Sequence, residues 1–268
     1  MDSKLDRLKS ILTDMESVVV AYSGGTDSTF LLKVAYDCLG DRVLGVTAVS
    51  ASMPVKERQE AESIAHLIGA PYSPIETRET EDPRYLENTP NRCYFCKSHV
   101  YDQILELAHG QGYRVVVDGT NLDDVGDHRP GRQAARERGV RSPLQEAGLT
   151  KAEIRDLARH LGLPNWDKPA AACISSRIPY GTTITIDMLS QVEQAESVLR
   201  QMGFGQVRVR HHDQIARIEV EPPYFQEVIK RGAEIVSALK KLGYTYVALD
   251  LAGFRSGSMN EVLGNHGR

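Results

Sequence analysis

Apolar residues in the first two thirds of the chain follow two alternating patterns. Short apolar runs, most of them rich in valine, predict buried strands at residues 17–22, 42–49, 71–75 and 112–118. Helical spacing of apolar residues predicts helices at 3–15, 28–39, 54–68 and about 97–109. Strands that alternate with helices are typical of an α/β fold, in which a parallel sheet carries helices on both faces.

The last third of the chain has a different pattern. A loop with two prolines, residues 165–183, precedes a predicted helix at 184–202. Beyond it we expect strands at 206–210, 214–220 and 244–250, a turn at His211–Asp213 and a helical stretch at about 223–242. The pattern predicts a first domain at 1–165, a linker at 166–183 and a small C-terminal α+β domain at 184–268.

Composition narrows the class of protein. The 268 residues are 41% hydrophobic and 25% charged, which is ordinary for a globular protein. The formal net charge of −4 argues against a nucleic-acid partner, because phosphate contacts need a basic surface. A charged N-terminus and the absence of a long apolar run predict no membrane partner and a cytoplasmic location. In that compartment the four cysteines are expected to serve metal binding or catalysis rather than disulfides.

A glycine-rich string stands between the first predicted strand and the helix that follows it. Glycines allow a tight turn and a close approach to an anion, and the helix N-terminus directs N–H groups at phosphates. Asp27 is expected to orient Mg²⁺ or to cap the helix, and an ordinary capped turn is the alternative for the whole string. The complete string favours a phosphate site made of Ser23, Gly24, Gly25, Thr26, Asp27 and Ser28.

Three cysteines call for a shared explanation. Cys93 and Cys96 form a C-x-x-C pair, and Cys173 lies in the long loop. Zinc is one reading, with His99 as a fourth ligand, and a redox pair is another that leaves Cys173 without a role. Three cysteines can also hold three irons of a [4Fe-4S] cluster and leave the fourth iron open to sulfur. A sulfur-donating Cys173 without a cluster is the remaining interpretation.

Basic residues alternate with valines on a predicted strand of the C-terminal domain. Strand periodicity places Arg208, Arg210 and His212 on one face. Arg217 joins that face if the next strand pairs with this one. A solvated surface is the ordinary explanation, but guanidinium groups also match carboxylates and phosphates. Further candidates for such an anion site are Arg177 and Arg255.

The glycine-rich string lacks the lysine of a Walker loop and resembles the PP-loop of the N-type ATP pyrophosphatases. Residues 118–124 resemble the second acidic motif of these enzymes, and residues 148–155 resemble a helix start that recurs in them. The resemblance implies that ATP is cleaved between its α and β phosphates with Mg²⁺, and that AMP passes to a substrate oxygen. It adds Gly119, Thr120, Asp123 and Asp124 to the nucleotide site.

The whole chain resembles the LarE-type sulfur transferases of nickel-pincer nucleotide synthesis. The segments that carry this resemblance are 23–29, 91–97, 119–124, 128–131, 166–169, 172–181, 207–212, 249–251 and 257–260. It implies that a small anionic nucleotide, pyridinium-3,5-biscarboxylic acid mononucleotide, is adenylated on a carboxylate and then receives sulfur. It also implies a homo-oligomer.

The same resemblance bears on the source of the sulfur. Cys173 matches the position of a cysteine that some members sacrifice. The additional Cys93 and Cys96 resemble the branch in which all three cysteines hold a [4Fe-4S] cluster with a transferable sulfide. Three alternatives remain for the chain as a whole: a PP-loop tRNA thiolase, an ammonia-using ligase that leaves the cysteines without a role, and a nucleotide sensor without catalysis.

Overall fold

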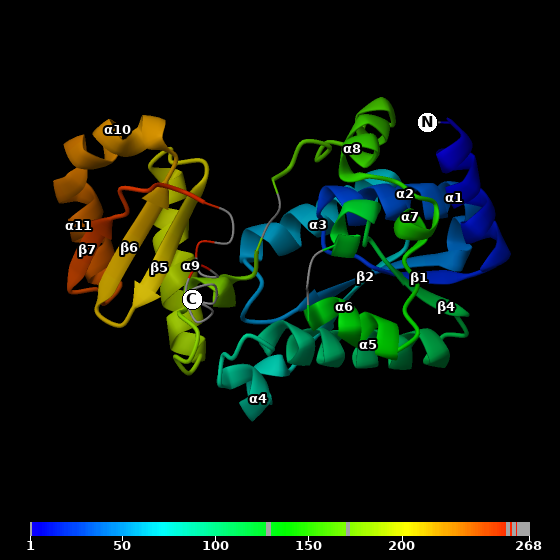
Figure 1. The fold of residues 1–268 in the computed structure, drawn as a ribbon, viewed down its shortest axis with the longest axis horizontal. Coiled ribbons are helices and arrows are strands. Elements are labelled where there is room, and N and C mark those ends of the chain that lie inside the picture. Colours follow the sequence, from blue (N-terminus) through cyan, green and yellow to red (C-terminus); the bar gives the residue numbers. More distant parts are fainter. Residues whose placement is uncertain (1, 127–129, 170–171, 256–257, 259–260, 262–268) are drawn as a thin grey trace. The chain divides into compact units, whose positions relative to one another are not determined.

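The computed structural model describes residues 2–126, 130–169, 172–255, 258 and 261. The chain forms two compact units (Figure 1). Unit 1 comprises Met1–Tyr85 and Asn91–Ala171, and unit 2 comprises Leu86–Pro90 and Ala172–Arg268. Within the described part of the chain, no helix combines the length and apolar character that a membrane span requires.

Unit 1 is built on a parallel sheet. Its strands are β1 (Val18–Ala21), β2 (Val43–Val49), β3 (Tyr72–Glu76) and β4 (Val115–Asp118), in the order β3-β2-β1-β4. The α/β fold expected from the sequence is therefore confirmed. The fourth strand begins later than the pattern suggested, because Tyr113 still donates its N–H to Ala108 at the end of the preceding helix.

Helices cover both faces of this sheet. They are α1 (Asp2–Asp14), α2 (Thr26–Leu39), α3 (Val55–Ile68), α4 (Pro83–Leu86), α5 (Arg92–Gly110), α6 (Pro130–Glu137), α7 (Pro143–Glu146) and α8 (Lys151–His160). Figure 1 shows α2, α3 and α8 on one side of the sheet and α5 and α6 on the other.

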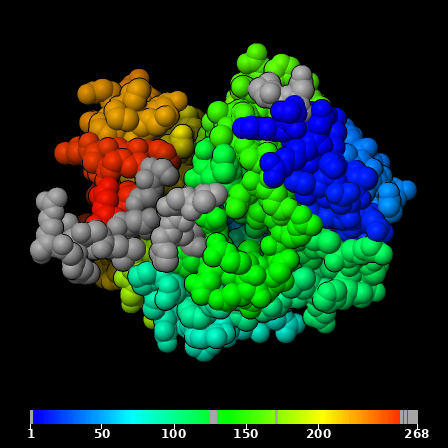
Figure 2. Space-filling model, turned by 45° about the vertical axis from the view of Figure 1, so that its right-hand side comes forward, coloured from blue at the N-terminus to red at the C-terminus, as the bar shows by residue number. Residues whose placement is uncertain are grey.

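The two faces have separate cores, because successive strand residues point to opposite sides. Val18 and Val20 pack against residues of α1, α2 and α8, whereas Val19 packs against α5 and α6. Helix α1 lies at the surface of unit 1, where its blue spheres adjoin the green of α8 (Figure 2). Lys4 of α1 makes an ion pair with Glu153 of α8 there, at 2.7 Å.

Unit 2 contains a three-stranded sheet. Its strands are β5 (Val207–His212), β6 (Ile215–Val220) and β7 (Tyr246–Leu249), in the order β5-β6-β7, with β5 antiparallel and β7 parallel to β6. Its helices are α9 (Ile186–Gln201), α10 (Phe225–Lys230) and α11 (Gly232–Lys241). The small core joins Leu199 of α9, Val207 and Val209 of β5 and Ile218 of β6.

Three sequence expectations are corrected by the structure. The turn expected at His211–Asp213 begins only at Asp213, whose φ of 53° reverses the chain, so both histidines belong to β5. The expected helix at about 223–242 is two helices broken at Arg231. Helix α5 begins at Arg92 rather than near 97, since Asn91 O accepts the N–H groups of Tyr94 and Phe95. The C-x-x-C pair is therefore helical.

Candidate functional site

The glycine-rich turn joins β1 to α2 at the carboxyl end of the sheet. Gly24 has a φ of +72°, and a Cβ at this position would come 2.7 Å from Cβ of Ala61, so both conformation and space require glycine. Ser28 Oγ accepts the N–H of Ser23 at 3.2 Å and closes the turn. Gly25 precedes the first helical residue, and no side chain caps the N-terminus of α2. The first-turn N–H groups of α2 are therefore available to an anion.

The segment after β4 packs against this turn. A Cβ on Gly119 would lie 3.0 Å from Ser28 N, so the backbone of this segment approaches the first turn of α2 closely. Asn121 Nδ2 donates to Asp27 Oδ2 at 3.2 Å, and Asn121 Oδ1 accepts the N–H groups of Asp123 and Asp124. The structure thus brings together the two motifs that the sequence assigned to one nucleotide site.

The acidic residues of this segment have local partners. Thr120 N donates to Asp118 Oδ1 at 3.1 Å, and Asp123 Oδ2 accepts the N–H of Lys151 at the start of α8 at 2.8 Å. Asn121 was not included in the site predicted from the sequence. Its place between the glycine–threonine pair at 119–120 and the aspartate pair at 123–124 could have indicated it. The expected capping box of α8, with Thr150 and Glu153, is present.

Asp27 has an unsatisfied carboxylate oxygen. Oδ1 of Asp27 is buried and has no hydrogen-bond partner among the described residues. Burial raises the pKa of Asp27 above its ordinary value, while the nearby Lys151 and the hydrogen bond from Asn121 act in the opposite direction. A buried oxygen without a partner is costly, and Mg²⁺ prefers oxygen ligands. The site therefore fits a magnesium ion held by Asp27 beside the phosphates.

The C-x-x-C pair lies on the first turns of α5 in unit 1. Residues three apart on a helix lie on the same side, so Cys93 and Cys96 can address one ligand. Gly131 of α6 packs against this turn, and a Cβ there would meet Cys93 O at 3.5 Å. Tyr101, one turn further along α5, donates to Asp118 Oδ2 at 3.1 Å. Burial raises the pKa of Tyr101, and both Asp118 and Cys96 add to that shift.

The zinc reading gains no further ligand. His99 Nε2 lies 2.7 Å from Asp82 Oδ2, which in turn binds Arg84. Among the described residues, no three His, Cys, Asp or Glu side chains gather to bind one metal ion. None of the four cysteines forms a disulfide bond in the structure. Cys93 and Cys96 belong to unit 1, whereas Cys173 belongs to unit 2.

Cys173 is exposed at the start of a 3₁₀ turn, η4 (Ile174–Arg177). Arg177 Nη1 donates to Ala172 O at 2.7 Å, to Cys173 O at 2.9 Å and to Ser176 Oγ at 3.0 Å. The other side of the same guanidinium makes two hydrogen bonds to Glu196 of α9, at 2.8 and 3.0 Å. A bidentate pair therefore fixes the turn that carries the thiol.

This pair is buried. The side chains of Arg177 and Glu196 are 2% and 0% exposed. Burial alone would raise the pKa of Glu196, but Arg177, Arg208 and Arg200 outweigh it and hold the pKa below the ordinary value. Sequence reasoning missed Glu196, although a charged residue beside Val192 and Leu199 on the apolar side of α9 was a usable signal.

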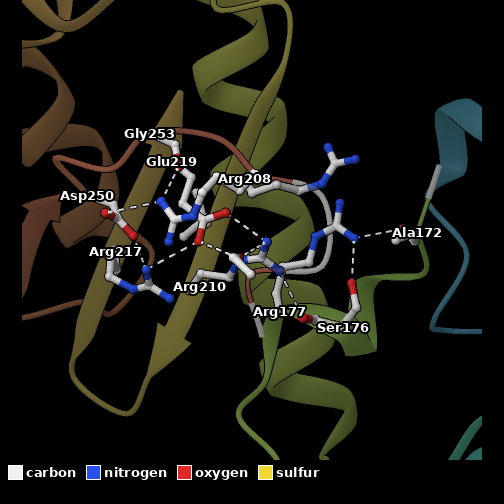
Figure 3. Close-up of polar contacts among 12 residues, drawn as sticks. Ala172, Ser176, Arg177, Arg208, Arg210, Arg217, Glu219, Asp250 and Gly253 are labelled. Atoms are coloured by element: carbon white, nitrogen blue, oxygen red, sulfur yellow. Dashed lines mark hydrogen bonds and ion pairs between the residues drawn. The ribbon is translucent and has the colours of Figure 1, made fainter. Parts of the chain in front are cut away.

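The arginines of β5 and β6 point to the same region, as Figure 3 shows. Arg210 donates to the fully buried Glu219 at 2.7 Å and to Ser176 O at 3.0 Å. Arg217, its partner across the two strands, makes ion pairs with Glu219 and with Asp250. Arg177, Arg210 and Arg217 are thus each held by carboxylates of unit 2.

Arg208 differs from these arginines. Its guanidinium donates a hydrogen bond to Val207 O at 3.0 Å and lies over the ring of Phe254, with 5.3 Å between the guanidinium carbon and the ring centroid. No ion pair joins it to a carboxylate within the described residues. Burial lowers the pKa of Arg208 to about 10, and the neighbouring Arg177 adds to this shift. The carboxylate of Glu196 offsets part of this shift, and an anion at this position would offset more of it.

Some sequence candidates take other places. Arg255 pairs with Glu261 at 3.0 Å. Lys168 of the 166–169 segment is bound by Glu57 and Glu60 of α3, at 2.6 and 2.9 Å. Several residues of the resembling segments lie outside the described residues, namely His128, Arg129, Gly257, Met259 and Asn260.

Comparison with known proteins gives full-length relatives, although no family profile matches the chain. An uncharacterized protein from Synechocystis is 46% identical, over 98% of this chain and 99% of that protein. The pyridinium-3,5-bisthiocarboxylic acid mononucleotide synthase of Lactiplantibacillus plantarum is 42% identical, over 97% of this chain and 95% of the synthase. A tRNA-specific 2-thiouridylase from Desulforamulus reducens is 25% identical over 57% of this chain and 52% of its own length.

The parallel sheet, the glycine-rich turn before α2 and the acidic segment after β4 define an enzyme of the PP-loop class. The full-length relatives narrow this class. The chain belongs to the LarE-type family of sulfur transferases.

Glu196→Gln is expected to lower the free energy of unfolding at neutral pH by about 3–5 kcal/mol, because Arg177 would keep its buried charge without a counter-charge. The pKa of Glu196 is below its ordinary value in the folded protein, so its contribution is complete above about pH 5 and is lost as the pH falls. Thermal unfolding followed by circular dichroism from pH 7 to pH 4 measures both effects.

The matched control for this substitution is Glu227→Gln. Glu227 lies on the surface of α10, 4.0 Å from Lys230, so its loss should change stability little. Equal stability losses in the two variants would contradict the role assigned to the buried pair.

Proposed function

We propose that the chain is an ATP-dependent sulfur transferase of nickel-pincer nucleotide synthesis. It adenylates a carboxylate of pyridinium-3,5-biscarboxylic acid mononucleotide and converts that carboxylate to a thiocarboxylate. The observation that carries this proposal is the 42% identity, over almost the full length of both chains, to a pyridinium-3,5-bisthiocarboxylic acid mononucleotide synthase. Two rounds of the reaction give a bisthiocarboxylate.

The PP-loop supports the adenylation step. A substrate carboxylate oxygen attacks the α-phosphorus of ATP, the bond from that phosphorus to the bridging oxygen breaks, and pyrophosphate leaves. The first-turn N–H groups of α2 and the hydroxyls of Ser23 and Ser28 would bind the phosphate oxygens. Asp27, whose Oδ1 has no described partner, would hold the Mg²⁺ that offsets the phosphate charge.

Adenylation makes the carboxyl group reactive toward sulfur. A carboxylate resists substitution because its leaving group would be oxide, whereas the mixed anhydride releases AMP. A sulfur nucleophile then forms the new carbon–sulfur bond as the bond to AMP breaks. A thiolate or a hydrosulfide already carries negative charge on sulfur, so it attacks without a base to remove a proton.

We propose a [4Fe-4S] cluster as the source of sulfur. Cys93, Cys96 and Cys173 would hold three of its irons, and when bound it would supply a transferable sulfide at the fourth. The helical spacing of Cys93 and Cys96 suits two ligands to one group, and Cys173 is exposed. The alternative is that Cys173 gives up its own sulfur, with the other two cysteines in another role.

The arginine cluster of unit 2 supports an anionic substrate. Arg208 is partly buried among other arginines without a described carboxylate partner, so a substrate phosphate or carboxylate fits there best. Arg177, Arg210 and Arg217 already have ion pairs with carboxylates in the structure. In the proposal they mainly add positive electrostatic potential and position neighbouring groups. Nucleotide activation is accordingly assigned to residues 1–165 and substrate binding to residues 184–268, with the cysteine-bearing segment 166–183 between them.

The proposal includes a cytoplasmic homo-oligomer. An oligomer is supported by the small core that a three-stranded unit can bury alone. A tRNA thiolase is the second candidate, supported by partial similarity to a tRNA-specific 2-thiouridylase. The net charge of −4 and the fact that similarity to the 2-thiouridylase covers only about half of each chain favour a small nucleotide substrate over tRNA.

Release of pyrophosphate tests the proposed function directly. The protein with ATP and Mg²⁺ is expected to release pyrophosphate and AMP only when the biscarboxylate nucleotide is added. Asp27→Asn should slow this release by about a hundredfold or more, because one ligand of the ion is lost. Asp37→Asn, on the exposed side of the same helix, serves as the control and should keep the wild-type rate. Release stimulated by tRNA instead would favour the thiolase.

Arg208→Ala is expected to raise KM for the biscarboxylate nucleotide by about tenfold or more, since a charge-assisted contact to the substrate would be lost. The dissociation constant for ATP should not change. Steady-state kinetics and ATP titration measure the two effects, and Arg208→Lys should recover part of the loss. Unchanged kinetics in Arg208→Ala would make this residue part of an ordinary surface.

Anaerobic reconstitution with iron and sulfide distinguishes the two sulfur sources. The cluster proposal predicts visible thiolate–iron absorption that Cys93→Ala, Cys96→Ala and Cys173→Ala each abolish, while Cys38→Ala retains it. Mass spectrometry after turnover should show an intact Cys173. Loss of the elements of H₂S from Cys173 would instead establish the sacrificial route.

A further inference from the structure

Asn165 is a buried polar residue of unit 1 that has no role in the proposed adenylation or sulfur transfer. It lies beyond α8, 6% exposed, between Pro164 and Trp166. Its Nδ2 donates to Gly24 O at 3.0 Å and to Thr29 Oγ1 at 2.9 Å. Its own backbone oxygen accepts the hydroxyl of Thr26 at 2.8 Å. One residue thus contacts the glycine-rich turn and the first turn of α2 at three points.

The orientation of the amide is determined by its partner. A backbone carbonyl only accepts hydrogen bonds, so Asn165 must present its NH₂ group to Gly24 O. Its Oδ1 is buried without a partner among the described residues. An unpaired buried amide oxygen costs free energy, so apolar packing does not explain an asparagine here. The bond to Gly24 is the feature that only the amide NH₂ supplies.

The bond to Gly24 has a consequence for the next residue. In a trans peptide the C=O and the following N–H point in opposite directions. Asn165 holds Gly24 O on its own side, so the N–H of Gly25 points to the other side of the turn. Within the described part of the chain, that N–H donates to Ser23 Oγ at 3.4 Å, a long hydrogen bond. A phosphate oxygen can therefore take over this donor.

Gly24 is also confined by α3. Cβ of Ala61 in α3 leaves no space for a side chain on Gly24. Lys168 donates its N–H to Asn165 O at 3.1 Å, and its side chain binds Glu57 and Glu60 of the same α3. The turn at residues 165–168 is thus fixed to α3. Asn165 and Ala61, which both contact Gly24, therefore belong to one connected part of the structure.

We infer that Asn165 is a positioning residue that sets the phosphate-binding conformation of the glycine-rich turn, by directing the Gly25 N–H toward the phosphates of ATP. This inference rests on the proposed use of ATP and adds a residue distant in sequence from the turn. It assigns Asn165 an effect on the phosphate part of the ligand and none on the base or ribose.

The test compares ATP with adenosine, because a general structural defect would weaken both. Asn165→Ala is expected to weaken ATP binding by about tenfold to a hundredfold and adenosine binding by less than about twofold, in isothermal titration. Thr29→Val is the matched control. It removes the second hydrogen bond of the same amide but leaves the bond to Gly24, so the ratio of the two affinities should remain that of the wild type.

A second measurement needs no variant and applies if Asn165→Ala does not fold. In wild-type protein labelled with ¹⁵N-glycine, the Gly25 amide resonance should shift when pyrophosphate is added, and should shift little with adenosine. Equal weakening of ATP and adenosine in Asn165→Ala, unchanged ATP affinity in that variant, or a Gly25 resonance insensitive to pyrophosphate would each overturn the inference. A wild-type protein that binds no ATP would overturn the proposed function instead.

Discussion

The candidate nucleotide site of unit 1 depends on the close approach of backbone segments at the carboxyl edge of its sheet. Gly24 lies against Ala61 with no room for a side chain, and Gly119 lies against the first turn of α2, where a Cβ would crowd the backbone of Ser28. Such contacts leave backbone N–H groups and small hydroxyls as the surface that faces a ligand. A surface of this kind suits phosphates, because many weak donors can share the charge of one anion without a fixed positive charge.

Unit 2 depends on buried ion pairs rather than on close backbone contacts. Glu196 and Glu219 are both fully buried. Glu196 binds Arg177 from η4 and Arg200 from its own helix, and Glu219 binds Arg210 from β5 and Arg217 from its own strand. Burying charges costs much of what their attraction returns, so these pairs are better explained by position than by net stability. They fix the turn of Cys173 to α9 and β5 through Arg177 and Arg210. Among the four arginines of this cluster, Arg208 is the one without an ion pair to a carboxylate of the described residues.

The parts of the protein visible in the sequence are those that depend on local patterns. Valine-rich runs predicted β1, β2 and β4, and the glycine-rich string predicted the tight turn before α2, because neighbouring residues determine both. The start of α5 was missed because cysteine and aromatic residues are weak helix formers, and Asn91 begins the helix through backbone contacts. The strand alternation identified the arginine face. It did not reveal Glu196 as a counter-ion, since that carboxylate comes from a helix distant in sequence.

The contacts that hold the Cys173 turn determine what happens to the turn when the cysteine is modified. Arg177 grips carbonyl oxygens of Ala172 and Cys173 and the hydroxyl of Ser176, and none of these contacts involves the sulfur atom. These contacts therefore do not depend on the chemical state of the sulfur. A protein whose cysteine had been oxidised or alkylated would therefore keep the three hydrogen bonds from Arg177, and the modified side chain would stay at the same place on unit 2.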